Sequence, residues 1–185
     1  MSPPPLPQDL QERFGDALQV AADGCWELTV SPEAAREALE FLGCRREPPF
    51  SYFIALCGVD TGEHLEAVYL LSRVCSAEVL RVRVPLPRRA AKLQSVHDIW
   101  PGATWPEREI MEMYGIAVEG QPDVRHLLLP EDWKGFPLRK DYVYPADHPY
   151  LRRDPLREDP DAVLGAQGRP NSESPEDAEG KPQGP

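Results

Sequence analysis

The feature that most constrains the fold is a set of three runs of strand-forming residues in the middle of the chain. The run FSYFIALCGV (50–59) is rich in aromatic and β-branched residues, and after a turn that contains Gly62 the run LEAVYLLSRV (65–74) returns. In the third run, EVLRVRVPL (78–86), apolar residues alternate with arginines, so one face is buried and the other is basic. Because the connections are short, we expect an antiparallel meander.

Upstream of the meander, helical and strand-like patterns alternate. Apolar residues recur at helical spacing over 10–21, and Gly24 is placed to end that helix. The run CWELTV (25–30) alternates as a half-buried strand does. A serine cap followed by proline opens a second helix over 31–42, which Gly43 stops. The predicted fold class is α+β: a small, mostly antiparallel sheet with helices on one face.

Downstream of the meander the pattern becomes helical again. We expect a short helix through Leu93 and Val96 that ends around Trp100. Thr104 then caps a further helix, and Glu107, three residues on, completes a capping box.

The pattern divides the chain into four parts. Residues 1–9 form a flexible N-terminus, and 10–115 form the α+β domain, whose last helix ends at a glycine. Prolines recur over 116–156, which predicts a segment that runs extended along a surface. The acidic, proline-rich segment 157–185 has too few large aliphatic residues to offset its ordering entropy, so we expect disorder there.

Composition excludes several classes of function. The net charge of −11 argues against nucleic acid, because phosphate binding needs a basic face. The longest nearly apolar run is far shorter than the ~20 residues of a membrane-spanning helix. The start MSPPPLPQD lacks the features of a secretory signal, so we expect a cytoplasmic protein that reaches a membrane only through a partner.

The cysteines and histidines do not form metal-ligand motifs. Zinc and iron–sulfur sites draw ligands as close sequence pairs, and no such pair occurs here. We therefore predict no metal site and interpret the cysteines as buried or partly buried free thiols. The residues concerned are Cys25, Cys44, Cys57 and Cys75, with His64, His97, His126 and His148.

The stretch 105–142 is dense in charge but shows no catalytic motif. A glycine-rich phosphate loop and a nucleophile elbow are both missing from the chain, so we predict neither catalytic nor cofactor-binding residues. Glu107 and Glu109 would point about 200° apart on a helix, which favours solvated caps or partner contacts over an acid/base pair. Arg108 and Glu112 lie one turn apart and are expected to form an ion pair.

The segment PEDWKGFPLRKDY combines an aromatic anchor, Trp133, with the charges of Arg139, Lys140 and Asp141. Aromatic and arginine residues on an exposed segment are typical of protein interfaces. An arm that folds back over its own sheet would carry the same residues. Composition and spacing leave both alternatives open.

Two blocks of this stretch resemble the C-type subunit of the proton-pumping NADH:quinone oxidoreductase (NDH-1), respiratory complex I. The first block has the form E-R-E, apolar, any residue, acidic, Met, aromatic, Gly-Ile, and the second reads D-W-x-G-x-P-L-R-K-D-Y. The matching residues are Glu107 to Ile110, Glu112 to Ile116, Asp132, Trp133, Gly135 and Pro137 to Tyr142. The chain departs from the family pattern at Glu112, where Asp is usual, at Gln121, where His is usual, and at Val143, where Pro is common.

The resemblance implies a structural role in the quinone-reducing module of a complex that passes electrons from NADH through FMN and iron–sulfur clusters to quinone and translocates protons. It implies contacts with the D-type subunit, which the extended segment 116–156 would wrap, with the cluster-carrying B-type subunit and with other peripheral-arm subunits, and no cofactor on this chain. The complex would hold the chain at the cytoplasmic side of the membrane. The partner-binding residues implied are Glu107, Arg108, Glu109, Glu112, Tyr114, Asp132, Trp133, Gly135, Pro137, Leu138, Arg139, Lys140, Asp141 and Tyr142.

Two alternatives remain at this point. One is the equivalent subunit of a related membrane complex fed by ferredoxin or linked to a hydrogenase. The other is a free-standing adaptor that uses the same arm to bind an unrelated protein.

Overall fold

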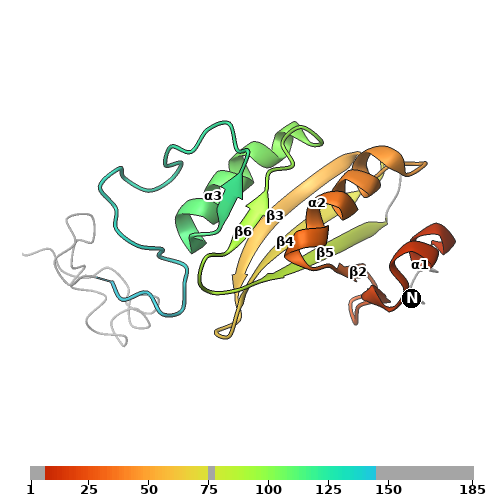
Figure 1. Cartoon of the computed structure of the whole chain (residues 1–185), viewed down its shortest axis with the longest axis horizontal. Coiled ribbons are helices and arrows are strands. Elements are labelled where there is room, and N and C mark those ends of the chain that lie inside the picture. The colour runs from red at the N-terminus through yellow and green to blue at the C-terminus, as the bar shows by residue number, and fades with distance from the viewer. Residues whose placement is uncertain (1–6, 75–77, 145–185) are drawn as a thin grey trace, which may run out of the picture. The chain divides into compact units, whose positions relative to one another are not determined.

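A computed structural model describes residues 7–74 and 78–144 (Figure 1). Contacts divide the chain into a unit of residues 1–143 and a unit of residues 144–185, and all but the last of the described residues lie in the first unit. Cys75 and the predicted tail over 157–185 lie outside the described residues.

The first unit is built on a five-stranded sheet with the order β1-β2-β5-β4-β3. The predicted meander is present, because β4 pairs antiparallel with both β3 and β5. The predicted fold class, α+β, is confirmed. The strands are β1 Leu18–Val20, β2 Trp26–Thr29, β3 Tyr52–Asp60, β4 Leu65–Ser72 and β5 Val79–Leu86.

One strand upstream of the meander joins it in parallel. Leu28 of β2 lies opposite Val82 of β5, and a parallel neighbour requires a crossover connection. Helix α2 (Pro32–Glu40) belongs to that connection and packs on β5 (Figure 1). The apolar residues of β5 are buried, as their alternation predicts.

The opposite face of β5 is charged, and its arginines are paired. Arg81 lies 3.0 Å from Glu27 of β2, and Arg83 lies 2.7 Å from Glu66 of β4. The basic face predicted from the alternation is thus neutralised by carboxylates of the neighbouring strands.

The predicted helix over 10–21 is wrong in its second half. Helix α1 (Gln8–Phe14) ends at Gly15, whose φ of 53° breaks the helical path, and a 3-10 turn over Gly15–Ala17 leads into β1. Leu18 then pairs with Leu28 of β2. Three residues are too few to distinguish strand from helix spacing, so pairing with β2 decides the outcome.

Gly43 does not stop the second helix. The helix continues as a π-turn, Phe41–Arg45, that includes this glycine. A Cβ atom at Gly43 would lie 2.6 Å from the indole of Trp100, so the glycine serves close packing.

The helix predicted through Leu93 and Val96 is also wrong. Lys92–Gln94 form strand β6, which pairs in parallel with β7 (Ala117–Glu119) in a second, two-stranded sheet. Leu93 is buried between two exposed neighbours, an alternation that suits a strand.

Helix α3 (Thr104–Tyr114) follows a 3-10 turn, Pro101–Ala103, and packs against β3 (Figure 1). It ends at Gly115 in the left-handed conformation, as expected. The predicted capping box is absent, because the Thr104 hydroxyl donates to the carbonyl of Pro101 and the Glu107 carboxylate binds elsewhere.

The cysteine interpretation holds for Cys25, which is partly buried, and is wrong for Cys44 and Cys57, which are exposed. Within the described ranges, no group of three or more Cys, His, Asp or Glu residues is arranged to hold a metal ion. No helix in those ranges has the length and apolar character needed to cross a bilayer.

Candidate functional site

The first turn of α3 directs Glu107 into the interior. Its Oε1 accepts a hydrogen bond from the Val96 amide at 2.7 Å, and its Oε2 accepts from the Ser95 hydroxyl at 2.6 Å and the Gln121 side-chain amide at 2.8 Å. Glu107 is 1% exposed, and this burial raises its pKa. The expectation of a charged surface contact at Glu107 is therefore wrong, because the carboxylate joins α3 to the β6–β7 sheet.

Arg108 and Glu112 do not form the predicted ion pair. Instead the Arg108 guanidinium donates to the carbonyls of Arg125, at 3.0 and 2.8 Å, and His126, at 2.9 Å. It also lies 3.2 Å from the carboxylate of Asp123. An arginine with several donors in a fixed fork is suited to holding successive carbonyls.

Glu112 binds the same loop through its amides. Its carboxylate accepts from the backbone N–H of Leu127 and Leu128, both at 2.9 Å, and of Leu129 at 3.4 Å. The His126 ring nitrogen lies 3.3 Å away. The run RHLLLP (125–130) has no regular secondary structure. Its backbone is held instead by the side chains of Arg108 and Glu112 of α3.

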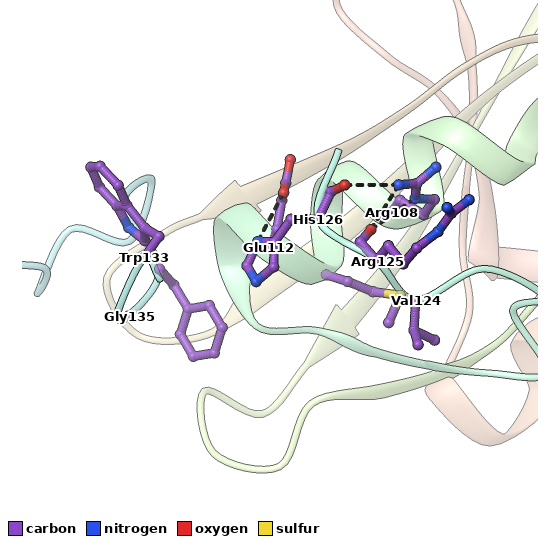
Figure 2. A pocket seen from close by; sticks show the side chains of 9 residues that line it. Arg108, Glu112, Val124, Arg125, His126, Trp133 and Gly135 are labelled. Atoms are coloured by element: carbon purple, nitrogen blue, oxygen red, sulfur yellow. Dashed lines mark hydrogen bonds and ion pairs between the residues drawn. The ribbon is translucent and has the colours of Figure 1, made fainter. Parts of the chain in front are cut away.

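A hollow of about 280 Å³ lies between α3 and this loop. Figure 2 shows Trp133 and Val124 at its two ends, with Glu112 and His126 between them. The lining residues are Arg108, Met111, Glu112, Val124, Arg125, His126, Trp133, Gly135 and Phe136. Both sequence blocks therefore contribute to one surface depression.

The segment 136–142, which we call the arm, closes the C-terminal end of α3. The Leu138 amide donates to the carbonyl of Met113 at 3.2 Å, and Arg139 Nε donates to the carbonyl of Tyr114 at 2.6 Å. The last carbonyls of a helix have no partner within the helix and attract cations. Arg139 also lies 4.9 Å from the centre of the Phe136 ring.

Two glycines let aromatic rings approach the backbone. The Phe136 ring lies 2.5 Å from where a Cβ atom of Gly115 would be, and the Tyr142 ring lies 2.6 Å from the corresponding point at Gly135. Both glycines have positive φ, which a residue with Cβ adopts at a cost. The Tyr142 ring in turn stacks on Trp133 with 6.4 Å between ring centres.

The arm is joined to the sheet at Asp60, the last residue of β3. The Lys140 amide donates to Asp60 Oδ2 at 2.8 Å, and Arg88 contacts both Asp60 and, at 2.8 Å, Asp141. Burial alone raises the pKa of Asp60, but hydrogen bonds from the amides of Lys140 and Gly62 and the Arg88 guanidinium outweigh it, so the pKa is lowered. The arm therefore packs against its own domain, and its role at a protein interface stays a prediction.

The remaining predicted partner-binding residues are exposed or partly buried. Glu109 and Asp132 are exposed, and Pro137 is partly buried. The ring of Tyr114 packs at 2.4 Å from where a Cβ atom of Gly58 would lie, and burial raises the pKa of its hydroxyl.

Large apolar side chains remain exposed along 124–143. The exposed fractions are 71% for Val124, 63% for Leu128, 49% for Leu138 and 83% for Val143. Contiguous apolar patches on a surface mark interaction sites, and this segment is a candidate for one. Of these residues only Leu138 belonged to the predicted set.

Sequence reasoning also missed Asp60, Arg88, Ser95 and Gln121. For Asp60 a signal existed, because Asp-Thr-Gly at the end of a strand is typical of a turn in which the carboxylate accepts the glycine amide, here at 2.8 Å. Arg88 has no comparable local signal, since its partners are distant in sequence.

The family model described as respiratory-chain NADH dehydrogenase, 30 Kd subunit, matches residues 28–148. The chain belongs to this family. The relationship predicted from the two blocks is confirmed.

Two relatives support the assignment. The C-type subunit of NADH-quinone oxidoreductase from Chloroherpeton thalassium is 38% identical over 138 residues, which are 72% of this chain and 58% of the relative. The C/D-type subunit of NADH-quinone oxidoreductase from Gluconacetobacter diazotrophicus is 33% identical over 139 residues, which are 68% of this chain and 23% of the relative. The chain therefore matches a little over half of the first relative and about a quarter of the second.

Two solved structures share the fold. A trypsin-resistant fragment of Nqo5 superimposes with a TM-score of 0.54 and 23% identity, covering 62% of this chain and 94% of the fragment. A chain from the membrane-bound sulfane sulfur reductase, an archaeal respiratory membrane complex, superimposes with a TM-score of 0.62 and 20% identity, covering 94% of this chain and 95% of that one. At these identities the likeness concerns the fold alone.

Proposed function

We propose that this chain is the C-type subunit of an NADH-quinone oxidoreductase and serves its quinone-reducing module in a structural and assembly role. The observation that carries the proposal is the family match over residues 28–148. The complex would pass electrons from NADH through FMN and iron–sulfur clusters to quinone and couple this transfer to proton translocation. These groups would be held by other subunits.

The geometry supports a structural role for the chain itself. Arg108 and Glu112 bind the backbone of a loop, and Arg139 binds the end of α3. Side chains that could stabilise a charged reactant are instead used to order irregular backbone. Such a framework presents a surface rather than an active site.

The proposed partner is a D-type subunit, with the cluster-carrying B-type subunit and other peripheral-arm subunits adjacent. Support comes from the C/D-type relative, whose name joins both types in one chain, so a C-type part lies within reach of a D-type part there. The proposed docking surface comprises the exposed apolar residues along 124–143 together with Glu109 and the block from Asp132 to Tyr142. Through these partners the chain would be attached to the cytoplasmic side of the membrane.

The test is co-purification of the tagged full-length chain from membranes of its own host. We expect D-type, B-type, flavin-carrying and membrane subunits in the eluate. Recovery of the chain alone, or with unrelated proteins only, would sink the proposal and favour the adaptor alternative.

A pair of variants locates the docking surface. Leu128→Asp places a charge on the proposed surface and should reduce recovery of the D-type subunit about tenfold or more, because a buried unpaired charge costs several kcal/mol. Val74→Asp is the matched control, since Val74 is 68% exposed and lies outside that surface. Equal loss from both variants would argue against this location.

The composition of the eluate also decides between related complexes. A complex with a ferredoxin- or hydrogenase-type input module in place of a flavin subunit would replace the NADH assignment while keeping the structural role.

A further inference from the structure

The end of strand β3 carries a buried carboxylate outside both sequence blocks. The Asp60 side chain is 2% exposed, and its two oxygens are approached from three directions. Oδ1 accepts from the Gly62 amide at 2.8 Å and faces Arg88, while Oδ2 accepts from the Lys140 amide at 2.8 Å. One aspartate thus joins a turn of the sheet to a residue 80 positions later.

Arg88 contacts both parts of this connection, and we call the contacts among Asp60, Arg88, Lys140 and Asp141 the joint. The same guanidinium contacts Asp60 and lies 2.8 Å from Asp141, the residue that follows Lys140. It also donates to the carbonyl of Gly62 at 3.0 Å. Charge-assisted bonds to a buried carboxylate are stronger and better oriented than an exposed ion pair.

The joint fixes the backbone next to exposed apolar groups. Leu138, two residues before Lys140, is 49% exposed, and Val143, two residues after Asp141, is 83% exposed. Lys140 Nζ also donates to the carbonyl of Thr61, next to Asp60, at 3.3 Å. The amide of Leu138 and the guanidinium of Arg139 bind α3 rather than the sheet.

We propose that Asp60, with Arg88, is the positioning residue of the docking surface. It holds the arm so that Leu138 and Val143 face outward in the arrangement a D-type subunit binds. This inference rests on the proposed function, because it assumes that partner. A preformed surface binds more tightly, since apparent affinity falls in proportion to the fraction of molecules that hold the competent arrangement.

The experiment uses the full-length chain with Asp60→Asn, which keeps the size of the side chain but removes its charge. Asp23→Asn is the matched control. Asp23 pairs with Arg81 at 2.6 Å and accepts a hydrogen bond from the Cys25 amide, but it lies just before strand β2 rather than at the end of β3. Arg88→Gln is the second variant and breaks the joint from its solvent side. Thermal melting confirms that each variant folds cooperatively.

The first readout is trypsin cleavage after Lys134, Arg139 and Lys140, followed by mass spectrometry. We expect about tenfold faster cleavage in Asp60→Asn and Arg88→Gln and no change in Asp23→Asn, because proteolysis follows the population of the open arm. Wild-type cleavage rates in both joint variants overturn the proposal. If Asp60→Asn fails to fold, Arg88→Gln alone decides.

The second readout is recovery of the D-type subunit with the tagged chain. About tenfold lower recovery with the two joint variants, and wild-type recovery with Asp23→Asn, supports positioning. Faster cleavage with unchanged recovery overturns it, because the arm would then be held for stability alone. Failure of the wild-type chain to recover any D-type subunit refutes the proposed function instead, and the cleavage rates still report whether Asp60 holds the arm.

Discussion

Two buried carboxylates hold two regions of this molecule, and their pKa values shift in opposite directions. At the junction of α3 with the β6–β7 sheet, Glu107 is surrounded by neutral donors, and burial raises its pKa. At the joint of the arm, Asp60 faces Arg88, and its pKa is lowered despite burial. The first region is fastened by neutral hydrogen bonds in the interior, whereas the second depends on a charge near the surface. The junction should therefore govern global stability, and the joint should govern the position of the arm.

The largest expected effect is that of Glu107→Ala. It leaves the Ser95 hydroxyl, the Val96 amide and the Gln121 side chain without their acceptor in the interior, which should cost about 3 kcal/mol of unfolding free energy. Urea denaturation followed by circular dichroism measures it. Glu109→Ala, two residues on and exposed, is the control and should change stability by less than about 0.5 kcal/mol. Equal effects from both would remove the distinction between interior and surface.

A smaller and more local effect is expected for Glu112→Ala. The amides of Leu127 and Leu128 lose their acceptor, but they belong to a loop, so the loss of about 1–2 kcal/mol should appear as local opening. Hydrogen exchange should accelerate at these amides and not in β4 or β5. Uniform acceleration across the sheet would show that the loop and the core unfold together.

The sequence predicts the long strands of the fold better than the short strands and the side-chain contacts that hold its parts together. Alternation over long strands such as β4 and β5 indicates both their existence and their buried face. Strands of three residues, such as β1 and β6, are chosen by a partner strand that local periodicity does not reveal. The site follows the same division. The two blocks indicate which residues matter, but a carboxylate three positions after Thr104 fits a capping box as well as it fits an interior hydrogen-bond centre, and the contact between Asp60 and Lys140 spans 80 positions.

The raised pKa of Glu107 predicts that its contribution to stability declines as pH rises. The folded pKa of Glu107 lies above its ordinary value of 4.5, so between the two values the folded chain binds more protons than the unfolded chain. Its contribution is therefore most favourable below pH 4.5 and declines as pH rises through the folded pKa. Glu107→Gln does not titrate, so the stability of the wild type relative to this variant should fall over that window. Urea midpoints of both proteins between about pH 4 and pH 7 measure the difference, and a relative gain by the wild type with rising pH would mean that the three donors outweigh burial.

The smallest effect belongs to an exposed pair that resembles the joint in chemistry but not in burial. The Arg36 guanidinium donates to Asp98 and lowers the pKa of that carboxyl to about 2, although the Asp98 side chain is 53% exposed. A lowered pKa adds stability above the ordinary value of 3.8 that is lost as pH falls toward 2. Because solvent screens an exposed pair, Asp98→Asn should cost less than about 1 kcal/mol at pH 7, and the difference from wild type should shrink toward pH 2. Urea midpoints at about pH 7 and pH 3 check both points. A loss of stability as large as that of Glu107→Ala would show that charge pairing, rather than burial, determines how much a carboxylate stabilises this protein.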